Sequence, residues 1–190
     1  MLRKLFFFLY QPLLLLRDWL PSPDQGQGFS TEQFIKGINL GGEAVTIEGH
    51  FWDSYRNALA NGLSAPGSQT VKTYVVPQPY VGREMCKMLN TAVFKTHVLE
   101  IEQALPNGDY SIYFWIMENY QTNWHSLNII VQECLVDQDV GRMRLGGWSK
   151  YGPYPGTVTN GILSLKIASN NPSLDAFVTG VGIFLSGDGT

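Results

Sequence analysis

Residues 105–133 read LPNGDYSIYFWIMENYQTNWHSLNIIVQE, and this stretch decides the fold class. After the turn residues Pro106, Asn107 and Gly108, apolar side chains recur at every second position, which is the period of a strand. The inward positions of this first strand are Tyr110, Ile112, Phe114 and Ile116. The alternation resumes after a polar, aromatic loop, with Leu127, Ile129 and Val131 inward. The stretch therefore predicts a hairpin of two strands, with a ligand-binding loop between them.

The second face of the first predicted strand is also rich in large side chains. Tyr113, Trp115 and Met117 alternate with the inward set. A face of this kind is either covered by another layer of the same domain or offered to a partner.

Composition favours an all-β domain over a helical one. The chain has 190 residues, of which 44% are hydrophobic and only 15% charged, with 20 Gly and 10 Pro marking frequent turns. Such a chain is long enough for one domain with a sizeable core and a tail. We expect about eight to ten short strands in an all-β, two-sheet jelly-roll β-sandwich.

Other segments fit this interpretation and supply its remaining elements. We expect a turn at Asn160–Gly161 to close a second hairpin, because this dipeptide is a strong hairpin signal. The expected strands and helical turn are Val45–Ile47, Val71–Val76, Glu84–Leu89 (helical), Val93–Glu102, Leu163–Ile167 and Val181–Leu185.

Charge and ligand-type residues exclude several functional classes. The net charge of −3 leaves no basic footprint for nucleic acid. His97 has no second ligand at metal-binding spacing, and Asp137 with Asp139 fits a solvated turn better than a calcium loop. We therefore predict no metal and no cofactor. Cys86 and Cys134 are expected to be free thiols, although export of the domain would make a bond between them plausible.

The amino-terminal run MLRKLFFFLYQPLLLLRDWL, residues 1–20, is the most apolar part of the chain. It lacks a small-residue cleavage site, and Gln11 with Pro12 interrupts it too early for a spanning helix. We expect it to anchor the protein at a membrane surface, the alternative being a helix packed on its own domain. The predicted anchor residues are Leu5, Phe6, Phe7, Phe8, Leu13, Leu14, Leu15, Leu16 and Trp19. Residues 21–33 follow as a linker, and residues 34–190 form the sandwich.

Four segments together resemble the malectin-like carbohydrate-binding domains found beside bacterial hydrolases and in receptor ectodomains. They are INLGGEAVTIEGHFW (38–52), NGDYSIYFWIMEN (107–119), WSKYGPYPGTVTNGILSL (148–165) and VTGVGIF (178–184), and the resemblance spans residues 35–185. It implies a non-catalytic jelly roll that binds glycans through loop aromatics and an acidic residue. By position, Tyr120 matches a sugar-contacting tyrosine of the family. Gln121 replaces the next family aromatic, and Asn170 stands where animal malectin has an aspartate.

Two groups of residues are candidates for binding a ligand or a partner. A sugar ring stacks on an aromatic face while amides and carboxylates take its hydroxyls, and Tyr and Trp serve a protein partner equally well. The candidates are Tyr120, Asn123, Trp124, His125, Trp148, Tyr151, Tyr154 and Asn170. We predict no catalysis. Glu100 and Glu102 lie on one face of a strand, where such carboxylates usually point to solvent, and no nucleophile elbow is present.

The sequence leaves two functional hypotheses. The first is a non-catalytic accessory or scaffolding subunit of a membrane complex, such as a photosynthetic or respiratory one, with membrane subunits and lipid as partners. The second is a membrane-tethered carbohydrate-binding module. The apolar segment and the departures at Gln121 and Asn170 favour the first hypothesis, the family resemblance favours the second, and we prefer the first. The absence of a cleavage site favours the cytoplasmic face of the membrane, with the opposite face as the alternative.

Overall fold

The computed structural model describes residues 32–187 of the chain. The predicted anchor at residues 1–20 lies outside the described residues, as does nearly all of the predicted linker at 21–33. Within residues 32–187, no helix is both long and apolar enough to span a bilayer.

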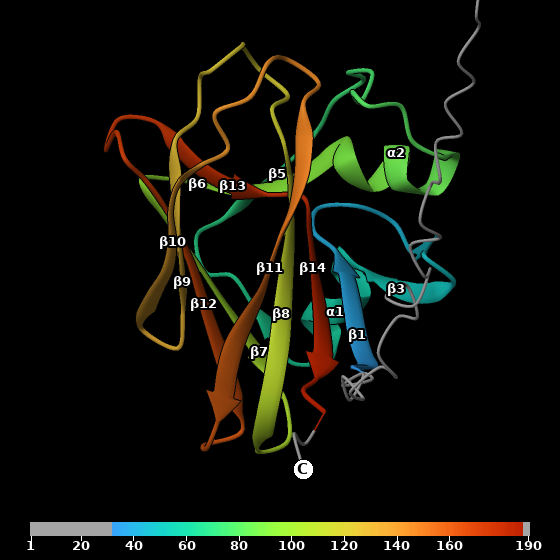
Figure 1. The fold of residues 1–190 in the computed structure, drawn as a ribbon, viewed down its shortest axis with the longest axis vertical. Coiled ribbons are helices and arrows are strands. Elements are labelled where there is room, and N and C mark those ends of the chain that lie inside the picture. Colours follow the sequence, from blue (N-terminus) through green and yellow to red (C-terminus); the bar gives the residue numbers. More distant parts are fainter. Residues whose placement is uncertain (1–31, 188–190) are drawn as a thin grey trace, which may run out of the picture.

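The described residues form a β-sandwich with a small third sheet (Figure 1). The first sheet has the order β11 (Trp148–Val158), β8 (Gly108–Met117), β14 (Gly180–Leu185), β1 (Gln33–Asn39), β3 (His50–Ser54) and β2 (Val45–Ile47). The second has the order β10 (Cys134–Val140), β9 (Leu127–Val131), β12 (Ile162–Ser169), β7 (Val98–Ala104) and β4 (Leu63–Ser64). The third comprises β13 (Asp175–Val178), β6 (Thr91–Thr96) and β5 (Gln69–Lys72), and the helices are α1 (Tyr55–Ala60) and α2 (Arg83–Leu89). The prediction of an all-β sandwich is confirmed.

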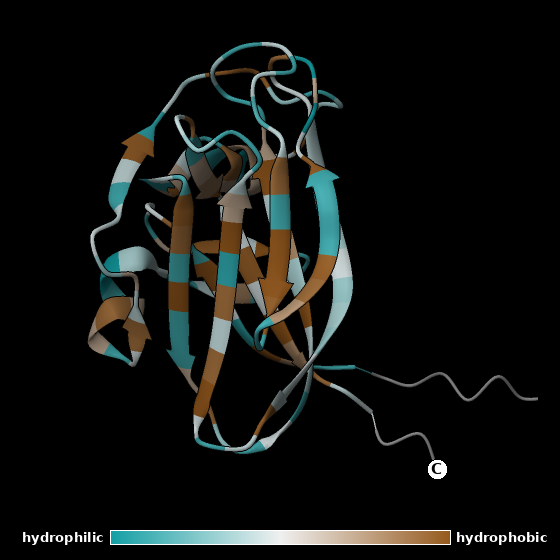
Figure 2. Cartoon of the chain, turned by 90° about the vertical axis from the view of Figure 1, so that its left-hand side faces the viewer, coloured by the Kyte–Doolittle hydropathy of each residue, from teal (hydrophilic) through white to brown (hydrophobic). Residues whose placement is uncertain are grey.

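The main core lies between the two larger sheets and is built from the alternating positions seen in the sequence. Tyr110, Ile112, Phe114 and Ile116 on β8 are at most 3% exposed, and Leu127, Ile129 and Val131 on β9 at most 1%. In Figure 2, hydrophobic and hydrophilic bands alternate in this way along several strands on the side that faces the viewer. The inward faces that the sequence predicts are therefore confirmed.

The second face of β8 is covered by its own domain towards the end of the strand. Trp115 and Met117 are 1% and 0% exposed and belong to a second apolar cluster with Trp52 of β3 and Met88 of α2. The rings of Trp115 and Trp52 meet edge to face, with centroids 4.9 Å apart. Tyr113 is only partly buried, and its hydroxyl donates to Glu32. This end of the strand face is therefore not available to a partner.

The predicted hairpin at residues 105–133 is wrong in its pairing. β8 hydrogen-bonds to β11 and β14, whereas β9 pairs with β10 and β12 in the opposite sheet. The loop between β8 and β9 therefore crosses from one sheet to the other at one end of the sandwich. The hairpin predicted at Asn160–Gly161 is wrong for the same reason: Gly161 does form a turn (φ +81°), but β11 and β12 belong to different sheets.

Two other predicted strands differ from the structure in their limits or number. The single strand expected at Val93–Glu102 is two strands, because His97 adopts φ +68° and turns the chain from β6 into β7. The strand expected at Val71–Val76 ends at Lys72. The helical turn expected at Glu84–Leu89 is confirmed as α2. The described residues hold fourteen strands, more than expected, because several are very short.

Candidate functional site

The loop from Glu118 to Ser126, between β8 and β9, is organised by one buried carboxylate. The Glu118 side chain is fully buried, and it accepts hydrogen bonds from the backbone N–H groups of Tyr120 (3.1 Å) and His125 (3.1 Å). The ring Nδ1–H of His125 also donates to the Glu118 carboxylate, at 3.0 Å. A buried carboxylate that is hydrogen-bonded in this way holds the loop in one conformation.

Two opposing effects set the pKa of Glu118. Burial raises it, but the hydrogen bond and charge of His125 and the two backbone N–H groups together outweigh burial, so the pKa lies below the ordinary value of 4.5. Glu118 is therefore ionised at neutral pH. An ionised carboxylate has only acceptor atoms, so Nδ1 of His125 must carry its proton.

The loop presents two aromatic side chains to solvent. Tyr120 is 60% exposed and Trp124 is 39% exposed, and their ring centroids lie 5.2 Å apart at an interplanar angle of 59°. The backbone N–H of Asn123, a residue with φ +57°, donates to the carbonyl of Met143 and ties the loop to the segment that precedes β11. The aromatic pair is thus held on a fixed backbone.

A cavity of about 390 Å³ lies between this loop and the third sheet. Its apolar wall includes Phe94 of β6 and Phe177 of β13, and the ring of Phe177 lies 4.4 Å from the His125 ring. Polar groups also reach it, among them the side chains of Asp175 and Ser173. The lining residues are Val71, Phe94, Asn119, Tyr120, Trp124, His125, Ser173, Leu174, Asp175 and Phe177. The cavity thus combines exposed rings with a few polar groups, as ligand sites commonly do.

One group of the predicted site residues lies together at this cavity. Tyr120, Trp124 and His125 line it, and Asn123 lies on the same loop with an exposed side chain. Asn170 is a neighbour of the loop: its amide donates to the Ser126 hydroxyl at 2.6 Å, but it is not among the lining residues.

The other group lies on β11, outside this cavity, and its polar atoms already have partners. The Trp148 indole N–H donates to the carbonyl of Pro79 at 2.8 Å, and the Tyr154 hydroxyl donates to Asp137. The Tyr151 hydroxyl accepts from the backbone N–H of Gly141, and Tyr151 and Tyr154 both pack against the main core. The structure gives these three side chains packing and hydrogen-bonding roles on β11.

Sequence reasoning missed the residues that complete the site. Glu118 reads as the polar end of a strand, and only its burial in the fold reveals its role. Asp175 is the carboxylate that lines the cavity, where the resemblance directs attention to Asn170. Phe94 and Phe177 read as ordinary strand residues, since no local signal marks a strand face that lines a cavity.

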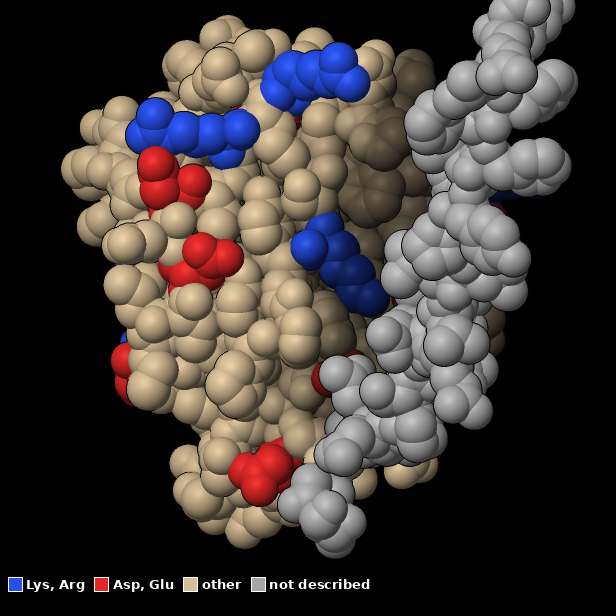
Figure 3. Space-filling view, viewed as in Figure 1, with Lys and Arg blue, Asp and Glu red and all other residues tan. Residues whose placement is uncertain are grey.

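The face shown in Figure 3 is not dominated by charge of either sign. Basic and acidic side chains are scattered over the face shown in Figure 3 and form no single-sign patch there. Among residues 32–187, no group of three or more His, Cys, Asp or Glu side chains is placed to hold a metal ion. Cys86 on α2 and Cys134 on β10 are both free thiols. At the cavity beside the Tyr120 loop, the described residues present two exposed rings, an imidazole and a carboxylate.

The architecture is that of a malectin-like domain. Similar solved structures include the ANXUR2 extracellular domain from Arabidopsis thaliana, a plant receptor-like kinase (TM-score 0.63, 14% identity, covering 80% of this chain and 49% of that one). A β-glucuronidase from Bacteroides uniformis is also similar (TM-score 0.64, 13% identity, covering 79% of this chain and 18% of that one). The chain thus spans about half of the receptor ectodomain and a smaller part of the enzyme. At these identities the likeness concerns the fold alone. The sequence matches no protein-family model and no curated protein.

Proposed function

We propose that this chain is a non-catalytic carbohydrate-binding module whose ligand stacks on Tyr120 and Trp124. The observation that carries the proposal is the exposed, tilted ring pair at a cavity of about 390 Å³ that Asp175 and His125 also line. A pyranose offers an apolar face to such rings, while carboxylate and imidazole groups pair with its hydroxyls.

Preorganisation of the loop supports this proposal. The four hydrogen bonds that Glu118 accepts from Tyr120, Gln121 and His125 fix the backbone before any ligand arrives. A loop fixed in this way loses little conformational entropy on binding, which favours recognition of a small polar ligand. We further propose that the chain is a module of the malectin-like type that accompanies bacterial hydrolases.

A glycan array probed with the full chain and with Tyr120→Ala and Trp124→Ala tests the proposal. Each variant should weaken binding by about tenfold, or about 1.4 kcal/mol, because the stacking surface is lost. Phe51→Ala is the matched control, since Phe51 is 65% exposed on β3 but does not line this cavity. Binding that survives both loop substitutions, or that falls equally in the control, would contradict the proposal.

A second candidate is the scaffolding subunit of a membrane complex. The observation that favours it is the segment from Tyr74 to Tyr80, in which Tyr74, Val76 and Tyr80 are 85%, 63% and 83% exposed. Exposed aromatic side chains grouped on one segment are typical of protein interfaces.

Co-purification from native membranes in mild detergent tests this role. Stoichiometric membrane subunits should accompany the full chain and be lost when Tyr74, Val76 and Tyr80 are all replaced by Ser. Phe51→Ser, at a side chain that is 65% exposed on β3, should leave them bound. A protein that purifies alone eliminates the scaffold, and retention of its partners after deletion of residues 1–20 would contradict the predicted anchor.

A further inference from the structure

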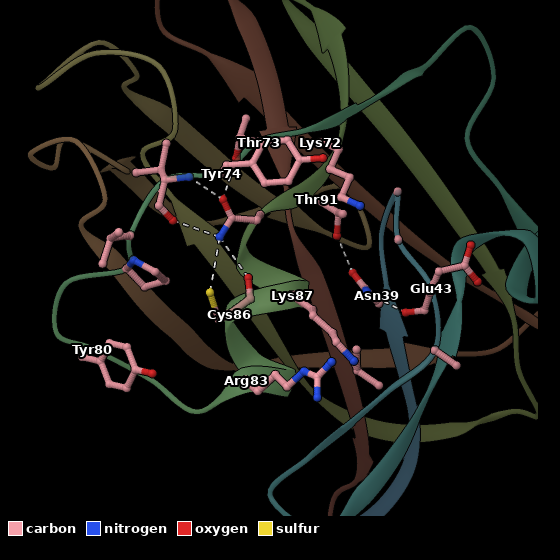
Figure 4. A pocket seen from close by; sticks show the side chains of 18 residues that line it. Asn39, Glu43, Lys72, Thr73, Tyr74, Tyr80, Arg83, Cys86, Lys87 and Thr91 are labelled. Carbon is pink, nitrogen blue, oxygen red and sulfur yellow. Dashed lines mark hydrogen bonds between the residues drawn. The ribbon is translucent and has the colours of Figure 1, made fainter.

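A second and larger cavity, of about 770 Å³, lies beside α2 and does not involve the Tyr120 loop (Figure 4). Its walls come from three places: the turn between β1 and β2, the irregular segment that follows β5, and α2. This volume is within the range of small-molecule sites.

The walls of this cavity are built and held by buried amides. The Asn90 side chain is 8% exposed; its carbonyl accepts from the backbone N–H of Val75 at 2.7 Å, and its amide donates to the Val75 carbonyl at 3.0 Å. On the opposite wall, Asn39 is 1% exposed and donates to the Glu43 carbonyl at 2.7 Å. Both walls are thus fixed by hydrogen bonds within the protein, and the cavity does not depend on a ligand to form.

Glycine allows the turn between β1 and β2 to approach closely enough to form one wall. Gly41 has φ +82°, and a Cβ at this position would lie 2.5 Å from the carbonyl oxygen of Ala92. Gly42 would place a Cβ 2.4 Å from the Asn39 side chain. The double glycine, which looks like an ordinary turn in the sequence, therefore shapes the cavity.

The charge around the cavity is one-sided. Among the described residues, Lys72, Arg83 and Lys87 line it and Glu43 is the only acidic residue that does, although acidic residues outnumber basic ones in the chain. Lys87 is paired with Glu84 at 2.6 Å. Within residues 32–187, neither Lys72 nor Arg83 has a carboxylate oxygen within 4.0 Å. Among the described residues, Lys72 and Arg83 are therefore not ion-paired, and the Lys72 ammonium lies 5.6 Å from the centroid of the Tyr74 ring.

The rest of the lining is mainly apolar. Val45, Val75, Val76 and Pro77 contribute to it, and Tyr74 and Tyr80 carry exposed rings at it. In Figure 4 the charged ends of Lys72 and Lys87 lie on the same side of the opening as Glu43, Tyr80 lies on the other side, and Arg83 lies between them. The cavity is therefore amphipathic, with a cationic side and an apolar side.

We propose that this cavity binds an amphipathic anion, a molecule with an apolar body and a single carboxylate or phosphate group. The anionic group pairs with Lys72 and Arg83, and the body covers Val75, Val76 and the tyrosine rings. A membrane surface fits less well, because a bilayer presents a flat face and this site is recessed. The apolar segment at residues 1–20 also fits poorly, since its basic residues Arg3, Lys4 and Arg17 outnumber Asp18. The proposal rests on this cavity alone and stands or falls separately from carbohydrate binding.

Calorimetric titration of the full chain tests the site, with decanoate as the probe and decyltrimethylammonium as a probe of equal chain length and opposite charge. Decanoate should bind and the cation should not. Arg83→Gln and Lys72→Gln should each weaken decanoate binding by about tenfold, because each removes a charge-assisted hydrogen bond. Arg56→Gln, at an exposed position on α1 outside the cavity, should have no effect.

The two cysteines provide a second measurement that needs no substitution. Cys86 lines this cavity, whereas Cys134 is exposed on β10 and does not. Decanoate should slow alkylation of Cys86 by iodoacetamide at least several-fold and leave the rate at Cys134 unchanged.

Four results would overturn the proposal. The first is equal binding of decanoate and decyltrimethylammonium, and the second is equal protection of Cys86 and Cys134. The third is binding only to vesicles that contain phosphatidylglycerol and not to monomeric decanoate. The fourth is a more than tenfold gain in decanoate affinity when residues 1–20 are deleted. The third would assign the cations to a membrane surface, and the fourth would make the chain's own segment the occupant.

Discussion

Replacing Glu118 with Gln should be far more damaging than a change of one atom suggests. One carboxylate oxygen accepts from the backbone N–H of His125 at 3.1 Å, and the other accepts from Tyr120, also at 3.1 Å. A Gln side chain keeps one acceptor and places an NH₂ group against the other donor. The variant therefore loses at least one charge-assisted hydrogen bond and leaves a buried N–H without a partner. The expected loss is about 2–4 kcal/mol in the free energy of unfolding.

Urea denaturation followed by tryptophan fluorescence measures this loss. With an m-value of about 2 kcal/mol/M, the midpoint should fall by about 1–2 M while the slope is unchanged. Glu102→Gln is the matched control, because Glu102 is exposed on β7, and its free energy of unfolding should stay within about 0.5 kcal/mol of that of the original chain.

The pH dependence gives an independent test of the same reasoning. The pKa of Glu118 is lower in the folded chain than its ordinary value of 4.5, so its contribution is fully present above that value and is lost as the pH falls through the lowered pKa. Glu118→Gln should remove this part of the acid sensitivity. A shift no larger than that of Glu102→Gln, or an acid profile identical to that of the original chain, would refute the assigned role of the carboxylate.

Two further substitutions test the packing of the sandwich. Met117→Ala should lower the free energy of unfolding by about 2–5 kcal/mol in thermal or urea denaturation, because Met117 is 0% exposed in the second apolar cluster. Ile162→Ala, at a 40% exposed position, is the control. A loss for Met117→Ala as small as that of the control would mean that this face of β8 is not covered. Gly41→Ala should lower the free energy of unfolding by at least about 2 kcal/mol, and Gly49→Ala by only about 1 kcal/mol. The two glycines have nearly the same φ (+82° and +81°), but a Cβ meets the Ala92 backbone at Gly41 and nothing within 4 Å at Gly49. Equal losses measured by urea unfolding would contradict this account of the turn.

The candidate site could be predicted in part because its most visible residues are contiguous in the chain. Tyr120, Trp124 and His125 lie on one loop, so local composition was enough to single them out. Their supporting residues come from elsewhere: Phe94 and Asp175 belong to β6 and β13 of the third sheet, which no local pattern places beside the loop. The larger cavity was missed for the same reason, since its cations come from β5 and α2.

By itself, the sequence determined the all-β class and the inward faces of β8, β9 and β12, because strand periodicity is local and one face of each strand must leave water. Only the tertiary structure decided which strands pair. Residues 105–133 read as a hairpin, yet β8 and β9 lie in opposite sheets, since pairing depends on partners such as β14 and β12 that are distant in the chain. The crossing between those sheets brings Glu118 into the interior, where its carboxylate shapes the loop that carries Tyr120 and Trp124.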